Sequence, residues 1–319
     1  MKKIAKTAGR IVCFALILLV LLLGTSLLFQ PKSNSKDAGM LDATANGILS
    51  EPKNTIDVLI VGDSEAYSAF IPLKVWKDYG YTPYVCATSA QILCYSYEFL
   101  EKTFQTQKPK IVMLETNAIY RSFSYSDIVT QKLSEKLSVF RYHNRWKTLS
   151  FRDWSFGVDL SNTEINKGYI YTNGINPANV KGYMRPTEMR ESFPNKNRTY
   201  VEKIQKLCEQ NGAKLVLVST PSVKNWDMRK HNAIMDFSKQ LGCDYLDMNT
   251  LRKEVPIDWQ TDTRDKGDHM NYEGALKVSS FIGKYCESLG VFKDKRGDEK
   301  YSGWDNAVKT FTESIGKDL

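Results

Sequence analysis

A serine near the beginning of the chain lies where nucleophilic chemistry is possible. Ser64 directly follows the apolar run IDVLIV and the pair Gly62-Asp63. Gly62 permits a tight turn, and the N–H groups at the start of a following helix would stabilise an oxyanion. The same residues also suit an Asp/Ser helix cap, so this motif alone leaves catalysis open.

One of the three histidines has carboxylates close to it in the sequence. His269 lies in the segment DKGDHMNYEGA, which also contains Asp265 and Asp268. A serine nucleophile needs a base that takes its proton and an acid that orients the base. We therefore interpret Ser64 and His269 as nucleophile and base. A structural histidine beside a helix start capped by Asp268 is the alternative.

Short apolar runs predict the strands that would position these residues. They lie at residues 56–61, 83–86, 110–114, 213–218 and 244–247. Runs that are apolar throughout suit strands buried on both faces of a parallel sheet. Amphipathic helical patterns lie between them, at 91–106, 199–210, 232–241 and 272–289. This alternation predicts a three-layer α/β/α sandwich with a mainly parallel sheet, in which ligands bind beyond the carboxyl ends of the strands.

Three further parts are predicted around this domain: a stalk, a C-terminal extension and an insertion. Residues 30–54 are polar and rich in small side chains, which is typical of an extracytoplasmic stalk. The α/β domain is predicted to cover 55–290, followed by a C-terminal extension at 291–319. Residues 122–197 interrupt the alternation, starting as a helix and becoming rich in Gly, Asn and Pro. We expect this insertion to cap the site.

The first thirty residues are predicted to anchor the chain in the cell membrane as a single span. Residues 1–10 carry four basic side chains, and residues 11–29 form a charge-free apolar run that can cross a hydrocarbon core of about 30 Å. By the positive-inside rule, the N-terminus is then cytoplasmic and the domain extracytoplasmic. A cleaved signal peptide is the alternative, although no A-x-A site follows the run.

The net charge does not indicate a nucleic-acid partner. The 319 residues include 44 Lys+Arg and 36 Asp+Glu, which gives +8. Four of the basic residues lie in the first ten positions and no acid lies in the first thirty, so 40 against 36 leaves +4 for the remainder. Charged residues at 25% and aromatic residues at 12% are ordinary globular values, which exclude wholesale disorder.

The cysteines predict no metal site. There are six, of which Cys13 lies in the apolar run, and no C-x-x-C pair occurs. Zinc ribbons and thioredoxin-type motifs are therefore excluded. The other five cannot all pair internally, so we expect small buried hydrophobic residues with at most one or two disulfides.

Together the two motifs resemble those of the SGNH (GDSL-type) hydrolase superfamily. The triplet GDS ending at Ser64 is similar to its first block, and the Asp/His loop before the last helix is similar to its last, so the resemblance covers about 56–289. It implies a flavodoxin-like sheet. The anchor, GDSE and DHMNYEGA more narrowly resemble membrane-anchored proteins of Gram-positive envelopes. Those proteins have a domain organisation similar to that of the proteins that work with membrane-bound O-acyltransferases in teichoic-acid D-alanylation and polysaccharide O-acetylation.

The resemblance implies roles for four residues. Ser64 would be the nucleophile, His269 the general base and Asn117, in LETN, the oxyanion-hole Asn. The family block around that Asn is usually Gly-x-Asn-Asp, of which only the Asn remains. The family's oxyanion glycine after the second strand is missing, and Ser89 in VCATSAQ is the substitute.

The acid of the site stays open between two residues. The family acid lies three positions before the His, where this chain has Lys266. Asp265 and Asp268 flank that position. Adjacent side chains usually diverge, which disfavours Asp268, and Gly267 allows the one-residue offset, so Asp265 is preferred.

Weaker signals lie after the fourth predicted strand and at the other histidines. In PSVKNW, Asn225 and Trp226 are candidates for sugar contacts by hydrogen bonding and stacking, with a hydrophobic cover for the loop as the equal alternative. His143 and His231 are expected to be structural. Three scattered histidines without grouped Cys or carboxylates do not make a zinc site, and no Gly-rich phosphate loop occurs.

These inferences predict an anchored extracytoplasmic serine esterase or acyltransferase without a cofactor. Its substrate would be O-acyl groups, O-acetyl above all, on an acylated polysaccharide or teichoic-acid-like polymer of the envelope. The resemblance implies a membrane-bound O-acyltransferase as partner. A non-catalytic scaffold of the same fold, which binds glycan or recruits that enzyme, is the alternative from another class. Fold alone does not decide between them.

Overall fold

The computed structural model describes residues 2–319 and divides them into two units. One unit contains the chain up to Ala43 together with Phe123–Asn162. The other contains Thr44–Ser122 together with Thr163–Leu319. Ser64 and His269 both belong to the second unit, so we describe its sheet first.

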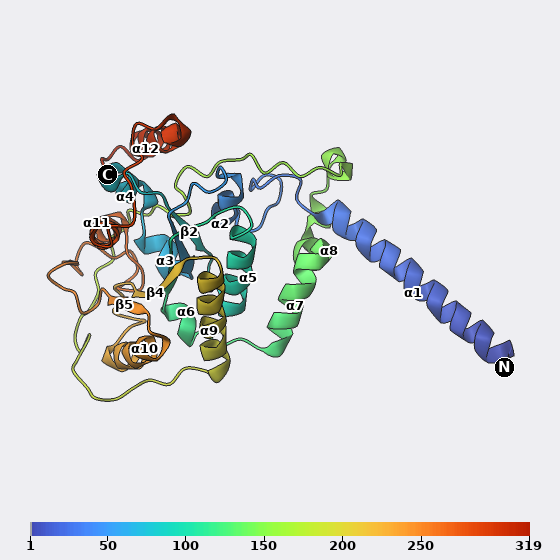
Figure 1. Cartoon of the computed structure of the whole chain (residues 1–319), viewed down its shortest axis with the longest axis horizontal. Coiled ribbons are helices and arrows are strands. Elements are labelled where there is room, and N and C mark those ends of the chain that lie inside the picture. Colours follow the sequence, from blue (N-terminus) through green and yellow to red (C-terminus); the bar gives the residue numbers. More distant parts are fainter. Residues whose placement is uncertain (1) are drawn as a thin grey trace. The chain divides into compact units, whose positions relative to one another are not determined.

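The second unit is built on a five-stranded sheet (Figure 1). Its strands are β1 (Val58–Gly62), β2 (Pro83–Ala87), β3 (Ile111–Glu115), β4 (Lys214–Ser219) and β5 (Asp244–Asp247). All neighbouring strands are parallel, in the order β2-β1-β3-β4-β5. Each strand predicted from the sequence overlaps one of these. The order reverses beside β1, and doubly wound sheets bind ligands at such a switch point.

Helices cover both faces of this sheet. Their bounds are α3 (Ser64–Ala69), α4 (Pro72–Tyr79), α5 (Leu93–Thr103), α6 (Asn117–Tyr120), α9 (Asn195–Gln210), α10 (Met228–Leu241), α11 (Tyr272–Ser288) and α12 (Ser302–Ile315). Figure 1 shows α4 and α11 on one side of the strands and α5 and α9 on the other. The predicted α/β/α sandwich is confirmed.

Alternate residues of the strands face opposite helix layers. Val58 and Ile60 of β1 pack in one cluster with Val278 and Ile282 of α11, and all four are buried. Leu59 and Val61 are equally buried, although they are not members of that cluster. Burial on both faces explains why the sequence of β1 is apolar throughout.

The C-terminal extension packs onto this unit. In α12, Trp304 lies with its ring centroid 5.6 Å from that of Trp76 in α4. The Trp76 indole N–H donates to Asp305 at 2.9 Å. Phe311 is buried and contacts the ring of Tyr169 edge-on. The extension is therefore part of the folded domain.

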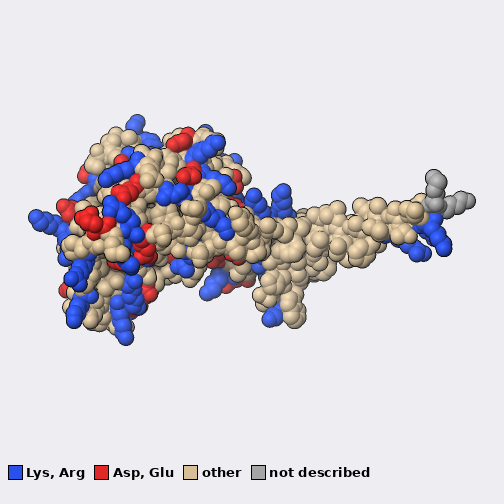
Figure 2. All heavy atoms as spheres, turned by 90° about the horizontal axis from the view of Figure 1, so that it is seen from below, with Lys and Arg blue, Asp and Glu red and all other residues tan. Residues whose placement is uncertain are grey.

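The first unit contains the N-terminal helix α1 (Lys2–Phe29), α7 (Tyr125–Lys136) and α8 (Ser138–Tyr142). Residues Lys3–Phe29 are long and apolar enough to span a membrane. Figure 2 shows that most of α1 carries no charged side chains. Basic residues lie towards its N-terminal end. Near its other end, Arg145 donates to the Phe29 carbonyl at 2.7 Å and pairs with Asp153.

Two expectations about connecting segments need correction. Residues 44–54 are no free stalk, because Ile48 is buried and Glu51 forms a buried ion pair with Lys167 at 2.6 Å. The insertion does not act as one piece either. Residues 123–162 belong to the unit of α1, whereas 163–194 belong to the unit that contains Ser64. The composition of the segment did not indicate this division.

No disulfide joins any of the six cysteines, all of which lie within the described residues 2–319. Cys86, Cys94, Cys208 and Cys286 are buried, and Cys243 is half-buried. The prediction of small buried hydrophobic residues is confirmed for the first four.

Candidate active site

Ser64 is the first residue of α3, directly after β1. Asp63 caps this helix, because its Oδ1 accepts the Glu65 N–H at 3.0 Å. Gly62 is needed for a steric reason, since a Cβ on it would lie 2.5 Å from the Cβ of Glu115 on the neighbouring strand. The turn therefore places the half-buried Ser64 side chain at the carboxyl edge of the sheet.

His269 connects Ser64 to a carboxylate. Its Nε2 lies 2.8 Å from the Ser64 Oγ, and its Nδ1 lies 2.7 Å from the Asp265 Oδ2. Asp265 also accepts the backbone N–H of His269 at 2.7 Å through Oδ1. The three side chains have the order nucleophile, base, acid of a serine hydrolase.

The hydrogen bonds distinguish the two candidate acids. Asp268 Oδ1 lies 3.8 Å from the His269 Nδ1 and accepts the Asn225 amide at 2.6 Å instead. Burial alone would raise the pKa of Asp265, but the hydrogen bonds from the backbone and ring of His269 outweigh it and hold that pKa below its usual range. Asp265 is thus the residue that orients the imidazole.

The loop between the acid and the base has an unusual backbone. Lys266 and Gly267 both have positive φ, at 64° and 83°. A Cβ on Gly267 would lie 2.8 Å from the Cβ atoms of Ala178 and Val223. The two left-handed residues bring an acid four positions before the His into hydrogen-bonding range.

Asn117 lies near the serine through its contact with Asp63. The Asn117 Nδ2 donates to Asp63 Oδ2 at 3.0 Å, and Arg121 pairs with the same oxygen at 2.9 Å. One amide hydrogen of Asn117 is used in this way. The second makes no hydrogen bond to the residues that the structure describes, and neither does the N–H of Ser64. These two donors are available for an oxyanion.

Ser89 lies in the exposed turn after β2, at the same edge of the sheet. No hydrogen bond connects Ser89 to the Ser64–His269–Asp265 chain within residues 2–319. The next residue, Ala90, has a φ of 54°, a conformation that glycine adopts without strain. The turn that follows β2 therefore has a strained backbone at Ala90.

Buried carboxyl groups beneath Ser64 were not predicted from the sequence. Glu65 and Glu115 are both almost fully buried. Burial first, and then the charge of Asp63, raises the pKa of each well above its usual range. The Asn225 amide donates to Glu65 at 2.7 Å. The only sequence signal was the acidic residue that directly follows Ser64.

Burial contradicts sugar stacking by Trp226, whereas a sugar contact by Asn225 stays a prediction. The Asn225 amide is used internally, as it donates to both Glu65 and Asp268. Trp226 is buried, and its indole N–H donates to Asp247 at 3.0 Å. The hydrophobic cover for the loop, which the sequence left open, describes Trp226 correctly.

The other histidines lie apart from this arrangement. His231 Nδ1 is 2.6 Å from Asp247 Oδ2, an oxygen that also accepts from Tyr245 and Trp226. This cluster fixes the end of β5. His143 belongs to the first unit and contacts the Phe140 carbonyl at 3.2 Å.

One group of possible metal ligands occurs among the described residues, formed by Glu65, Asp268 and His269. Both ring nitrogens of His269 already face Asp265 and Ser64. The Asn225 amide donates to both carboxylates. This arrangement favours hydrogen bonding over metal binding.

Comparisons with known proteins give matches among solved structures alone. No protein-family model matches the chain, and no curated protein matches it. Among solved structures it is similar to a GDSL-like lipase from Bacteroides thetaiotaomicron, with 12% identity, 77% of this chain and 96% of that chain covered, and a TM-score of 0.38. A lipase/acylhydrolase from Enterococcus faecalis matches with 9% identity, 73% and 97% covered, and a TM-score of 0.40.

An acetyl xylan esterase matches in the same range, with 12% identity, 72% of this chain and 99% of that chain covered, and a TM-score of 0.40. At these identities and TM-scores the similarity carries no argument about activity. The function is therefore argued from the geometry of the site.

Proposed function

We propose that the protein is a serine esterase or acyltransferase that uses Ser64, His269 and Asp265. One observation carries this proposal: the Ser64 Oγ, the two ring nitrogens of His269 and the Asp265 carboxylate form a hydrogen-bonded chain of 2.8 and 2.7 Å. A helix cap or a structural histidine requires no such chain. The geometry therefore favours an enzyme over a scaffold.

The reaction proceeds in two balanced steps. His269 Nε2 takes the Ser64 proton while Oγ attacks the carbonyl carbon of an acyl ester. The C–O bond of the ester breaks, the alcohol leaves with the proton from His269, and an acyl-serine remains. Water or a sugar hydroxyl then gives its proton to His269 and attacks the acyl carbon. The bond between that carbon and the Ser64 Oγ breaks, and His269 returns the proton to Oγ. Asp265 keeps the Nδ1 proton in place and stabilises the imidazolium.

The tetrahedral intermediate needs donors for its oxyanion. The Ser64 N–H and the second amide hydrogen of Asn117 are the donors that we assign, since both lack other partners among the described residues. Ser89 remains a candidate third donor at the end of β2. Removal of one such donor typically costs about 10²–10³ in kcat.

We propose that the substrate is an O-acetylated polysaccharide or a related polymer of the cell envelope. The resemblance of the GDSE and DHMNYEGA motifs to envelope proteins supports this substrate class. It also supports a membrane-bound O-acyltransferase as the partner that supplies acyl groups. The proposed chemistry requires no cofactor, because serine, histidine and aspartate supply nucleophile, base and acid.

The N-terminal unit supports a membrane location. Helix α1 has a charge-free apolar stretch with basic residues before it. Beyond it, the same unit exposes large aromatic side chains between residues 146 and 156: Trp146 at 64%, Phe151 at 93%, Trp154 at 70% and Phe156 at 86%. Trp154 and Phe156 line a hollow of about 450 Å³ with residues of α1. Aromatic side chains of this kind are typical of the membrane–water interface.

The proposal is tested by labelling with a serine-directed fluorophosphonate. The full-length chain in detergent should be labelled, and Ser64→Ala and His269→Ala should each abolish the labelling. His143→Ala is the matched control, because it removes an exposed histidine of the other unit and should leave labelling intact. Labelling that survives Ser64→Ala would contradict the assignment.

A further inference from the structure

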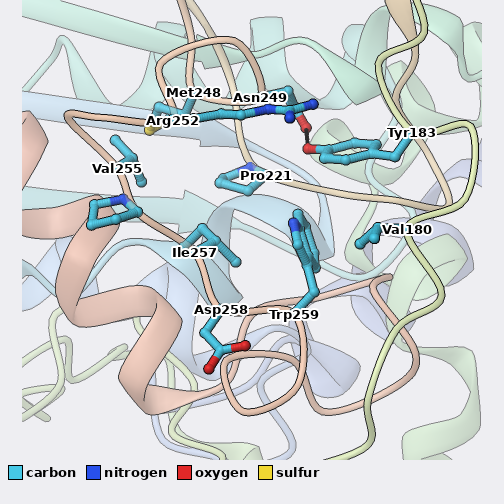
Figure 3. A pocket seen from close by; sticks show the side chains of 11 residues that line it. Val180, Tyr183, Pro221, Met248, Asn249, Arg252, Val255, Ile257, Asp258 and Trp259 are labelled. Atoms are coloured by element: carbon cyan, nitrogen blue, oxygen red, sulfur yellow. Dashed lines mark hydrogen bonds between the residues drawn. The ribbon is translucent and has the colours of Figure 1, made fainter.

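A second hollow lies at the carboxyl ends of β4 and β5, and the proposed mechanism does not use it. It has a volume of about 520 Å³ and follows both strands, with Pro221 after β4 and Met248 and Asn249 after β5 (Figure 3). Its volume falls in the range of small-ligand sites, about 300–1,000 Å³.

The walls of this hollow combine an aromatic pair with apolar side chains. Trp259 and Tyr183 meet edge-on, with ring centroids 5.2 Å apart and planes at 80°. The Tyr183 hydroxyl donates to Asn249 Oδ1 at 2.5 Å, which fixes the ring. Figure 3 shows the Trp259 ring in the middle of the hollow, between Val180 and Ile257.

Two charged side chains lie at opposite ends of the hollow in this view (Figure 3). The Arg252 guanidinium lies 5.9 Å from the ring centroid of Tyr183 and forms no ion pair within residues 2–319. One carboxylate oxygen of Asp258 accepts the Gln260 N–H at 2.9 Å, and the other has no partner in the described chain. Donors and an acceptor thus flank an aromatic face.

The hollow is connected to the catalytic loop by short hydrogen bonds. Ser222, the residue after Pro221, donates its backbone N–H to Asn249 Oδ1 at 2.9 Å and its hydroxyl to the Asp268 carbonyl at 2.9 Å. Asp268 directly precedes His269. On the other wall, the Ala178 N–H donates to the Trp259 carbonyl at 2.9 Å. The hollow therefore lies beside the site and is held by the same segments.

We propose that this hollow binds a glycosyl residue of the polymer, adjacent to the residue whose ester reacts at Ser64. A sugar ring has an apolar face that packs on an aromatic side chain and hydroxyls that need donors and acceptors at its edge. Trp259 supplies the face, Arg252 the donors and Asp258 the acceptor. The opposite charges of the last two favour an uncharged sugar. This inference rests on the proposed function for its polymer substrate.

The test measures binding directly. The full-length Ser64→Ala chain in detergent micelles is applied to an array of defined bacterial and plant oligosaccharides, and Kd is measured for those retained. We expect at least one neutral oligosaccharide to bind. Trp259→Ala in the same background should weaken binding about tenfold or more, which is the loss of about 1.4 kcal/mol.

A second variant protects the test against misfolding. Trp259 also packs against the core, whereas Arg252 is exposed, so Arg252→Gln should preserve the fold and still weaken binding several-fold. Trp146→Ala is the matched control, because it removes an equally large exposed indole of the other unit and should leave Kd unchanged.

Failure of this inference can be distinguished from failure of the proposed function. Hydrolysis of p-nitrophenyl acetate by the wild type reports on Ser64 and needs no sugar. If the wild type hydrolyses the ester but its Ser64→Ala form retains no oligosaccharide, the sugar site alone is overturned. The same holds if the wild type is active and oligosaccharide binding is unchanged in both Trp259→Ala and Arg252→Gln. Absence of hydrolysis together with Trp259-dependent binding overturns the enzyme and keeps the sugar site.

Discussion

Asp265 accepts two hydrogen bonds from His269, one from the backbone N–H and one from the ring Nδ1, each at 2.7 Å. The two bonds fix both the position of the loop and the orientation of the imidazole. Because the acid and the base are four residues apart, this contact is local and does not depend on the insertion at 122–197. It fixes which nitrogen faces Ser64.

Replacing the two flanking acids should have different effects. Asp265→Asn should lower kcat for p-nitrophenyl acetate by about 10³- to 10⁴-fold, because the amide cannot hold the required tautomer of His269. Asp268→Asn is the matched control and should lower kcat less than about tenfold, since Asp268 binds Asn225. Equal losses in the two variants would show that the acid is shared.

Gly267→Ala should both destabilise the protein and reduce its activity. A residue with a Cβ at a φ of 83° costs about 1–2 kcal/mol, and here the Cβ also contacts Ala178 and Val223. Gly297 has the same φ with no heavy atom within 4 Å of a Cβ. Gly297→Ala should therefore show the backbone cost without loss of kcat. Thermal unfolding and ester hydrolysis measure the difference.

Asn117→Ala should lower kcat by about 10²–10³ with little change in KM, because it removes a donor that acts on the oxyanion. The variant also removes a hydrogen bond to Asp63. Arg121→Gln removes another donor to the same carboxylate and controls for that loss. If Arg121→Gln reduces kcat as much as Asn117→Ala, the effect belongs to Asp63 and the oxyanion assignment fails.

Glu115 should make the stability of the protein depend on pH. Burial, with the charges of Asp63 and Glu65, raises its pKa well above the usual range. Protonated Glu115 therefore contributes its full stabilisation below about pH 4.3, the pKa of the group in the unfolded chain. This stabilisation is lost as the pH rises through the pKa of Glu115 in the folded protein. Glu115→Gln stays neutral. Its gain in Tm over the wild type should therefore be larger at pH 8 than at pH 5, and an equal gain would refute this explanation.

The membrane topology is tested with single cysteines. In a chain with Cys13 and Cys243 replaced by Ser, Lys36→Cys should react with an impermeant maleimide on intact cells. Lys6→Cys should react only after the membrane is opened, because the basic residues are retained in the cytoplasm. The reverse pattern would contradict the proposed orientation. Loss of the Lys36→Cys protein from the cells would indicate that the N-terminal segment is cleaved.

The sequence predicted the sheet and the Ser64–His269 pair because both depend on local patterns. Continuous apolar runs identified the five strands, and parallel strands bring their carboxyl ends to one edge. The preference for Asp265 required only the divergence of adjacent side chains and the freedom of Gly267. Each of these signals comes from residues within ten positions of the strand or side chain that it predicts.

The remaining features depend on contacts between distant segments. Glu115 becomes a buried neighbour of Glu65 only because β3 pairs with β1. Trp226 is covered rather than exposed because Asp247, at the end of β5, accepts its N–H. Trp259 and Tyr183 are far apart in the chain and meet only in the fold. Composition and periodicity carry no signal for such pairs.

The central claim is that Ser64 forms a covalent acyl intermediate. It is tested most directly by brief incubation of the full-length protein with p-nitrophenyl acetate, followed by acid quenching and peptide mass spectrometry. The variants Gly267→Ala and Asp265→Asn are used to slow turnover. The account predicts one acetyl group on Ser64 and none in the Ser64→Ala chain. Turnover with an unmodified Ser64, or acetyl transfer to another residue at the same rate, would contradict it.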